Sequence, residues 1–234
     1  MYQSDFHRKK DFANPNLFGN PTQTETVPPP SQAPARAEPA KEIKEQEEVR
    51  AEHLFKHPLQ NAWTLWYLES DRTKSWEDMQ NEITSFETVE DFWSLYNHIK
   101  PPSEIKSGCD YSLFKKGVRP MWEDVANKQG GRWVINVMKN SKSDLDNLWL
   151  DVLLCLIGEA FDNTDQICGA VVNVRTKGNK ISIWTADGTK KDAVLEIGTK
   201  LKDALRLGNL SLQYQLHKDT MAKHSSNVKS VYTL

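Results

Sequence analysis

The sequence predicts an α+β domain in which a mostly antiparallel sheet carries helices on one side. Two observations favour this fold class: short runs of alternating apolar and polar residues recur along the chain, and three helical signals lie between them. The runs are bounded by turn signals at Gly130-Gly131, Gly178-Asn179 and Asp187-Gly188, as expected of antiparallel strands. The predicted strands are Ala62–Leu68, Arg132–Met138, Ala170–Arg175, Lys180–Ala186 and Leu210–Leu216.

Two of the predicted helices begin at box-like N-caps. Thr88-Val89-Glu90-Asp91 opens the first and Ser143-Asp144-Leu145-Asp146 opens the second, because a hydroxyl side chain followed by acids satisfies the free amides of a first turn. The third helix is predicted from about Asp192 to Leu207, with Gly208 as its stop signal. Its apolar face comprises Val194, Ile197, Leu201 and Leu205.

Residues 1–52 differ in composition from the rest of the chain. They contain Pro28-Pro29-Pro30 and many small or polar residues, but few large apolar side chains. Such a segment cannot bury enough surface to offset the entropy of ordering, so we expect a disordered tail. The proline cluster is then either plain solvated chain or a polyproline ligand. Residues 53–234 have the composition of one folded domain.

Charge and apolar patterning exclude several classes of protein. The 234-residue chain has a formal net charge of -2, whereas proteins that coat nucleic acid carry a basic excess, so any anion site must be local. No apolar run reaches the roughly 18 residues of a membrane span. The polar N-terminus lacks the apolar core of a signal peptide. We therefore expect a cytoplasmic protein, with the nucleus as a second address, and no membrane association.

The sequence shows no pattern typical of a metal centre or an active site. Cys109, Cys155 and Cys168 lie in apolar segments without C-x-x-C spacing, so we expect reduced, buried thiols. The six histidines form no H-E-x-x-H motif, and no Walker-type loop is present. We therefore predict no metal, no cofactor and no enzymatic activity.

Two cations are predicted to lie side by side on one face of the sheet. Strand alternation places Asn173 with Arg175, and a hairpin closed at residues 177–179 makes Arg175 a neighbour of Lys180. Because adjacent cations repel unless an anion lies between them, this pair indicates a phosphate site, with a solvated basic hairpin as the alternative. Arg132 is a candidate third cation.

Two of the eight tryptophans, Trp76 and Trp122, lie in polar surroundings where a core residue would be unusual. An indole face attracts a flat cationic ring by about 0.5 to 2 kcal/mol beyond the contribution of the buried area. Glu123 can accept two hydrogen bonds from the N1-H and N2-H2 edge of guanine, which adenine and the pyrimidines lack. With the phosphate site, these groups describe a positively charged guanine on a phosphate chain, a 7-methylguanosine cap.

Two predicted helices are apolar on more than one face, which indicates either complete burial or an exposed protein-binding patch. The helix that begins near Ser143 has two apolar stripes. The stripe that should pack on the sheet comprises Leu145, Leu148, Trp149, Val152, Leu153 and Leu156. The second stripe comprises Leu150, Leu154 and Ile157. The helix that begins at Thr88 likewise has two sets of apolar residues. One set is Phe92, Leu95 and Ile99, and the other is Val89, Trp93 and Tyr96. Periodicity alone supports both interpretations equally.

A series of motifs over about residues 53–234 closely resembles the eukaryotic translation initiation factor 4E family, the mRNA cap-binding proteins. The motifs are His57-Pro58-Leu59-Gln60-Asn61, Trp63-x-x-Trp66, Thr88-Val89-Glu90-Asp91-Phe92-Trp93, Met121-Trp122-Glu123-Asp124, Gly130-Gly131-Arg132-Trp133, Cys155-Leu156-Ile157-Gly158-Glu159 and Val171-Val172-Asn173-Val174-Arg175. The resemblance implies a curved, mostly antiparallel sheet of about eight strands. It also implies three helices on the convex face and a cap slot on the concave side.

The resemblance also implies roles for individual residues. The base would stack between two indoles, an acid would read the guanine edge, a third indole would contact the 7-methyl group, and basic and polar side chains would hold the phosphates. The two stacking indoles would be Trp76 and Trp122, the acid Glu123, and the third indole Trp184. The side chains that hold the phosphates would be Arg132, Asn173, Arg175, Lys177 and Lys180.

By the same resemblance, the convex back binds a Tyr-x-x-x-x-Leu-apolar helix of the 4G scaffold or of competing 4E-binding repressors. This favours the exposed patch over complete burial. The partner-binding residues are then His57, Pro58, Leu59, Val89, Trp93, Leu150, Asp151, Leu154 and Gly158. Asp151 stands where the family usually has glutamate, so an altered affinity for the scaffold is expected.

Ser226 is the phosphoacceptor that the resemblance implies, among C-terminal lysines. Its neighbours His224 and Ser225 differ from the usual ones, so an unmodified flexible segment is the alternative. A phosphate there would add a charge of about -1.5 to -2 near the anion site and weaken the binding of capped RNA.

Three functions therefore compete. The first is a cap-binding initiation factor, monomeric but working within the larger cap-binding complex with the scaffold. The second is a cap-binding paralogue that binds the scaffold poorly and acts as a repressor or competitor. The third, a cap-hydrolysing enzyme, is disfavoured because the metal-binding patterns that its chemistry needs are missing from the sequence.

Overall fold

The computed structural model describes residues 55–71, 73–75, 77–138, 142–208, 210–222 and 228–234. The fold below is that of the unit that comprises residues 50–234. The predicted tail, residues 1–52, and the predicted site residues Trp76 and Ser226 lie outside the described residues.

The sheet has eight strands in the order β2-β1-β3-β5-β6-β4-β7-β8. Every pairing between neighbouring strands is antiparallel, as predicted. The strands are β1 (Pro58–Leu68), β2 (Gln80–Thr88), β3 (Asp110–Lys115), β4 (Gly131–Val137), β5 (Ile167–Asn173), β6 (Asn179–Thr185), β7 (Leu212–Leu216) and β8 (Tyr232–Thr233).

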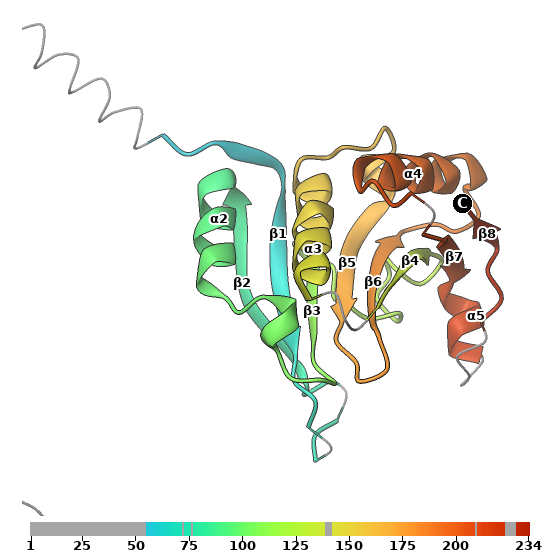
Figure 1. Cartoon of the computed structure of the whole chain (residues 1–234). Helices are drawn as coiled ribbons and strands as arrows, with labels where there is room; N and C mark the ends of the chain where they lie inside the picture. The colour runs from blue at the N-terminus through green and yellow to red at the C-terminus, as the bar shows by residue number, and fades with distance from the viewer. Residues whose placement is uncertain (1–54, 72, 76, 139–141, 209, 223–227) are drawn as a thin grey trace, which may run out of the picture. The chain divides into compact units, whose positions relative to one another are not determined.

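Three long helices lie together on one side of this sheet (Figure 1). They are α2 (Val89–His98), α3 (Lys142–Ile157) and α4 (Lys191–Ala204). A short helix, α5 (His217–Ala222), follows β7, and two 3-10 turns are η1 (Pro102–Glu104) and η2 (Thr164–Gln166). The predicted fold class is confirmed. Within the described residues, no helix is both long and apolar enough to span a bilayer.

Several predicted boundaries are wrong by a few residues. Met138, Arg175 and Leu210 lie outside the strands to which alternation assigned them. Helix α3 begins at Lys142, so the predicted cap sequence at Ser143 lies inside the helix. Helix α4 ends at Ala204, before the predicted Leu207, because the chain turns there into positive φ at Arg206 (49°) and Gly208 (54°). The cap at Thr88 is confirmed, since its Oγ1 accepts the Asp91 amide at 3.2 Å.

The core lies between the sheet and the helices. The sheet-facing stripe of α3 is buried as predicted, with Leu145, Trp149, Val152, Leu153 and Leu156 all at 2% exposure or less. Only Leu148 of that stripe is half-buried. Trp133 of β4 is fully buried, and its Nε1 donates to the Val194 carbonyl of α4 at 2.9 Å. This bond fixes α4 against the sheet at the strand that also carries Arg132.

Gly198 is a position at which α4 packs closely against Trp133 of the sheet. A Cβ there would lie 2.3 Å from Trp133 Cζ2 and 2.6 Å from Cε2, so the indole would have to move. We predict that Gly198→Ala lowers the free energy of unfolding by up to about 2 kcal/mol. The overpacking penalty of about 1 to 3 kcal/mol exceeds the helix-propensity gain of about 1 kcal/mol. Urea denaturation measures this change.

The exposed neighbour Thr199 provides the matched control for this substitution. Thr199→Ala gains helix propensity without a clash, so it should leave stability unchanged or slightly raised. A Gly198→Ala protein as stable as the Thr199→Ala protein would contradict the close approach.

Candidate functional site

A cavity of about 140 Å³ lies on the face of the sheet opposite the helices. Its strand residues alternate with core residues such as Tyr111, Leu113 and Ile183, which point toward the helices. The cavity is lined by apolar, aromatic, polar and charged side chains from seven parts of the chain, namely Leu68, Gln80, Asp110, Ser112, Pro120, Trp122, Arg132, Val171, Asn173 and Trp184. Four of the nine residues predicted to bind the cap therefore line one cavity.

Trp122 is presented by a loop that its own polar side chains hold in shape. Asn127 is fully buried, and its Nδ2 donates to the carbonyls of Arg119 (2.9 Å) and Met121 (2.8 Å). The Asp124 carboxylate accepts the Arg119 amide at 3.0 Å. Trp122 itself is half-buried against a small apolar cluster that includes Trp184, while Glu123 is exposed beside it. The loop thus holds the Trp122 indole in the wall of the cavity, and the next residue in the chain, Glu123, is exposed.

Trp184 forms the inner wall and is only 4% exposed. Its ring meets Phe114 edge to face, with centroids 5.4 Å apart, and lies 4.3 Å from the His217 ring at 46°. The buried Trp184 Nε1 and Ser182 Oγ have no hydrogen-bond partner among the described residues. Buried polar atoms of this kind are normally satisfied, so a ligand or water is expected to meet them.

His217, the first residue of α5, stands behind Trp184 and is fully buried. Neither of its ring nitrogens has a hydrogen-bond partner among the described residues. Burial, assisted by the charge of Arg132, lowers the pKa of His217 to about 3. The ring is therefore neutral at physiological pH, and the wall behind the cavity carries no second positive charge there.

Arg132, Arg175 and Lys180 lie close enough together to influence one another. Burial lowers the pKa of Lys180, and the charges of Arg132 and then Arg175 lower it further. Burial also lowers the pKa of the Arg132 guanidinium. Among the described residues, neither Lys180 nor Arg132 forms an ion pair. Partly buried cations without a carboxylate favour a bound anion.

Arg175 departs from the prediction in one respect. Strand β5 ends at Asn173, so Asn173 rather than Arg175 pairs with Lys180 across the hairpin. The Arg175 guanidinium instead donates two hydrogen bonds to the Asp110 carboxylate, one from Nη1 to Oδ1 and one from Nη2 to Oδ2 at 3.0 Å. Lys177 lies exposed in the hairpin turn. Arg175 is thus held in place by an acid, while Lys180 and Arg132 carry uncompensated charge.

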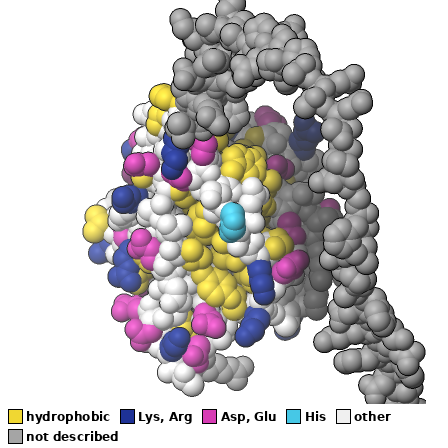
Figure 2. Space-filling view, turned by 90° about the vertical axis from the view of Figure 1, so that its left-hand side faces the viewer, with side chains coloured by type: hydrophobic (Ala, Val, Ile, Leu, Met, Phe, Trp, Pro, Cys, Tyr) yellow, Lys and Arg dark blue, Asp and Glu magenta, His cyan; other side chains and the backbone are white. Residues whose placement is uncertain are grey.

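The predicted partner-binding residues lie on α2, α3 and the start of β1. Figure 2 views the molecule from the side of β2 and α2 and shows hydrophobic side chains gathered in the middle of that face. Val89, Trp93 and Leu150 are half-buried, and Leu154 is 37% exposed. Ile157, predicted on the same stripe as Leu150 and Leu154, is buried at 6% exposure and belongs to the core. The second stripe of α3 is therefore shorter than predicted.

The start of β1 is fastened to the start of α2. The His57 amide donates to Glu90 Oε2 at 2.8 Å, and His57 Nδ1 lies 2.6 Å from Glu90 Oε1. The Val89 amide in turn donates to the His57 carbonyl at 2.9 Å. Gly158 is exposed just after α3, where a Cβ would lie 2.9 Å from the Leu154 carbonyl.

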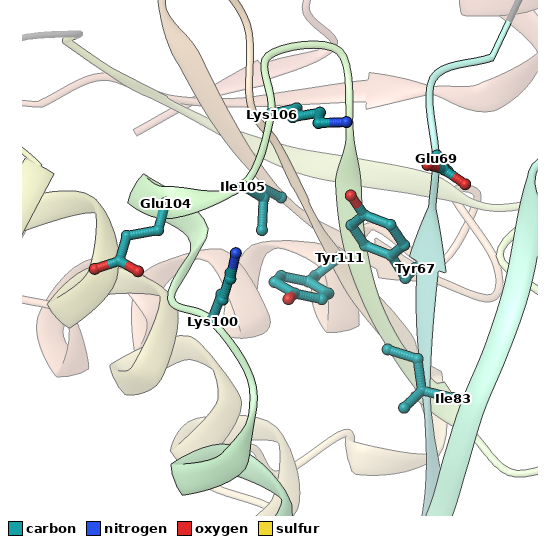
Figure 3. A pocket seen from close by; sticks show the side chains of 8 residues that line it. All are labelled: Tyr67, Glu69, Ile83, Lys100, Glu104, Ile105, Lys106 and Tyr111. Carbon is teal, nitrogen blue, oxygen red and sulfur yellow. The ribbon is translucent and has the colours of Figure 1, made fainter.

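A second cavity, of about 300 Å³, lies beside η1 and the ends of β1 and β3 (Figure 3). Tyr67 and Tyr111 line it, and the Lys100 amino group points toward Ile105 and Tyr111, whereas the Glu104 carboxylate points away. Its charged side chains are of both signs, Lys100, Lys106, Glu69 and Glu104. Nothing here matches a base joined to a phosphate chain, so the cavity at Trp122 is the better candidate site.

The described residues contain no group of three metal-ligating side chains, and all three thiols are free. Cys109 and Cys168 are buried, and Cys155 is half-buried. Burial raises the pKa of the Cys168 thiol to about 12, which keeps it protonated and unreactive.

Comparisons with known proteins place the chain in a family. The family model described as eukaryotic initiation factor 4E matches residues 58–232. Eukaryotic translation initiation factor 4E1 of Drosophila melanogaster is 68% identical, and the match covers 99% of this chain and 100% of that protein.

Solved structures of relatives support the same family assignment. One structure holds eIF4E-3 of C. elegans with the 4E-binding protein Mextli and a cap analog. That eIF4E-3 chain is 50% identical to this chain with a TM-score of 0.72, and the match covers 77% of this chain and 100% of the eIF4E-3 chain. Another holds eIF4E-3 of Ascaris suum with an m7G cap, at 48% identity and a TM-score of 0.72, with 77% of this chain and 98% of that one covered.

The chain therefore belongs to the eukaryotic initiation factor 4E family. The predicted recognition is confirmed, and the family is one of initiation factors rather than of enzymes.

Sequence reasoning missed three residues that shape the site. Asp110 holds Arg175, Asn127 holds the Trp122 loop, and His217 supports Trp184. An aspartate before an apolar run and an asparagine in a polar loop have no distinctive pattern. His217 follows a predicted strand directly, which is a weak signal at best.

The buried, neutral His217 leads to a prediction about how the stability of the fold depends on pH. Its pKa is lower in the folded than in the unfolded state, so the unfolded chain binds the extra proton as pH falls below about 6.5. Stability should therefore decline between about pH 6.5 and 3, by about 2 kcal/mol from pH 7 to pH 5 for this one site. Urea denaturation at both pH values, with wild type and His217→Phe, measures the effect.

The His217→Phe protein keeps a ring behind Trp184 but has no proton to bind. Its stability should fall much less over the same interval, whatever its stability at pH 7. Equal pH dependence in the two proteins would refute the buried neutral histidine.

Proposed function

We propose that this protein binds the 7-methylguanosine cap of mRNA in the cavity at Trp122. The proposal is carried by one observation: in that cavity the indoles of Trp122 and Trp184 come together with Arg132, a half-buried cation that has no ion-pair partner among the described residues. The solved relative from Ascaris suum holds an m7G cap, which supports assigning the same ligand to this chain.

Each group has a distinct role in the proposed complex. The methylated guanine is a flat cation, and it stacks on the electron-rich face of Trp122, with Trp76 as the second stacking partner. Glu123 accepts the paired donors of the guanine edge, and Trp184 contacts the 7-methyl group. The phosphates then lie against Arg132, Lys180 and Arg175.

The remaining polar residues complete the phosphate site. Arg132 and Lys180 interact directly with the phosphates, because no acid among the described residues neutralises them. Asn173, paired with Lys180 across the hairpin, and the exposed Lys177 adjoin the phosphate path.

We predict that the wild-type protein binds 7-methyl-GTP at least about 10-fold more tightly than GTP, because only the methylated base is a cation. Trp122→Ala and Glu123→Gln should each lower 7-methyl-GTP affinity by about 10-fold or more, through loss of stacking and of charge-assisted hydrogen bonds. Tryptophan fluorescence quenching measures these affinities.

Val125, in the same loop and 92% exposed, gives the control substitution Val125→Ala, which should leave both affinities unchanged. Equal affinity of the wild-type protein for GTP and 7-methyl-GTP would overturn the proposed function.

We further propose that the convex surface binds the 4G scaffold, so that the capped mRNA is brought to the translation machinery in the cytoplasm, with a second pool in the nucleus. The protein acts as a monomer within that complex. Repressor proteins compete for the same surface in this proposal, and the C. elegans relative solved with the 4E-binding protein Mextli supports a protein partner for the chain. The partly exposed Trp93, Leu150 and Leu154 supply apolar anchors for a helix.

A cap-binding repressor that engages the scaffold poorly is the second candidate, because Asp151 is exposed on α3 and is one methylene shorter than the family's usual glutamate. In either case, we propose that phosphorylation of Ser226 would add negative charge to the protein and weaken capped RNA binding.

A scaffold peptide containing Tyr-x-x-x-x-Leu should lose about 10-fold or more in affinity for Trp93→Ala, since a large aromatic anchor is removed. The neighbouring exposed Ser94→Ala is the control and should bind like wild type. Isothermal titration with Asp151→Glu separates the two candidates. Tight wild-type binding that Asp151→Glu leaves unchanged excludes the repressor, whereas weak binding restored by Asp151→Glu excludes the active initiation factor.

A further inference from the structure

We propose that Ser75 and Asp78 are positioning residues, which hold the β1–β2 loop in the form that binds the methylated base. This inference rests on the proposed cap-binding function, in which Trp76 is the second stacking partner. Trp76 itself lies outside the described residues, whereas Ser75 directly before it and Glu77 directly after it are described. The contacts of these neighbours carry the inference.

A tight turn between β1 and β2 is capped by the side chain of Ser75. Its Oγ accepts the Asp78 amide at 3.1 Å, and its hydroxyl donates to Asp78 Oδ2 at 2.7 Å. In the backbone, the Ser75 carbonyl accepts the Met79 amide and the Glu77 carbonyl accepts the Gln80 amide, each at 3.2 Å. A serine oxygen that accepts the amide three residues later is the N-cap of a helical turn.

The Asp78 carboxylate fixes the orientation of the Ser75 hydroxyl. A hydroxyl has one hydrogen, and because the carboxylate accepts it, a lone pair of the oxygen is left for the Asp78 amide. Both residues are exposed, so this pair determines the shape of the loop and adds nothing to the core. Each of the two side chains therefore supports the same cap.

The base of the loop is closed by other contacts, and it leads into the cap cavity. The Glu69 amide donates to the Met79 carbonyl at 3.1 Å, and the Asp71 amide donates to Met79 Sδ at 3.3 Å. The next residue, Gln80, is the first residue of β2 and lines the same cavity as Trp122. The capped turn is therefore joined directly to the wall of the proposed base site.

A stacking residue that is in place before the ligand arrives binds it more tightly than one that must first be ordered. The apparent dissociation constant is the intrinsic one divided by the fraction of molecules whose loop already has the binding form. Loss of an N-cap lowers that fraction several-fold. The cap thus affects base binding even though neither side chain needs to contact the base.

The test measures 7-methyl-GTP affinity of the full-length protein by isothermal titration. We expect Ser75→Ala and Asp78→Ala each to lower this affinity about 3- to 10-fold, since each removes part of the cap. Ser75→Thr keeps an N-cap oxygen and should bind within about 2-fold of wild type.

The charge control is Glu77→Gln. Glu77 is an exposed acid of the same turn, and its side chain forms no ion pair with a described residue. Its substitution removes one negative charge, as Asp78→Ala does, but leaves the cap intact. We expect its affinity to stay within about 2-fold of wild type.

A double-mutant cycle decides whether the cap acts through Trp76. In a Trp76→Ala protein, titrated to millimolar ligand, Ser75→Ala should lower the affinity no further, because the ring that it positions is gone. Urea denaturation should give the same free energy of unfolding for wild type and Ser75→Ala, because the side chain is exposed.

Loss of affinity on Ser75→Ala that disappears in the Trp76→Ala protein supports the inference. Unchanged affinity of Ser75→Ala, an equal loss in both backgrounds, or a less stable Ser75→Ala fold overturns it while cap binding is retained. A wild-type protein that binds GTP as tightly as 7-methyl-GTP overturns the proposed function and this inference together.

Discussion

The alternation of side chains across one antiparallel sheet is the constraint on which the rest of the structure depends. In β4 and β6, Trp133, Ile135, Ile181 and Ile183 point into the core, and the residues between them point to the opposite face. The helices cover the first set, whereas Arg132 and Trp184 of the second set line the cavity on the opposite face. Arg132 and Trp184, register partners on neighbouring strands, are therefore brought together by the same pairing that builds the core. A slip of one residue in either strand would exchange the two sets.

The electrostatics of the site depend on which of its cations have an acidic side chain beside them. Asp110 is close to fully buried on β3 and holds Arg175 by two hydrogen bonds, so one cation is oriented rather than free. Arg132 and Lys180 have no such acid among the described residues, and their pKa values are lowered by burial. Charges kept without a counterion are costly in the absence of a ligand, and that cost is relieved when an anion binds. The arrangement gives the site a preference for phosphate although the whole chain is slightly acidic.

Sequence patterns predicted the fold class, five of the strands and all three long helices, but they failed where burial is unusual. Strand β3 is buried at almost every position, so it shows no alternation. Edge strand β2 is mostly exposed and β8 has only two residues, so neither carries a clear apolar pattern. For the site, alternation and the residue types indicated a group of cations with Lys180 and Arg132, whereas the role of Trp184 came only from the family resemblance. The contacts of Asp110, Asn127 and His217 depend on tertiary packing, which no local pattern encodes.

The link between the start of β1 and the start of α2 has a consequence for molecular recognition. Because His57, Glu90 and Val89 are joined by side-chain and backbone hydrogen bonds, this part of the convex surface is already rigid before any partner arrives. A preorganised receptor loses little conformational entropy on association, so most of the ordering cost falls on the incoming peptide. Differences in affinity among competing ligands of this surface should then track how readily each one folds into a helix on its own.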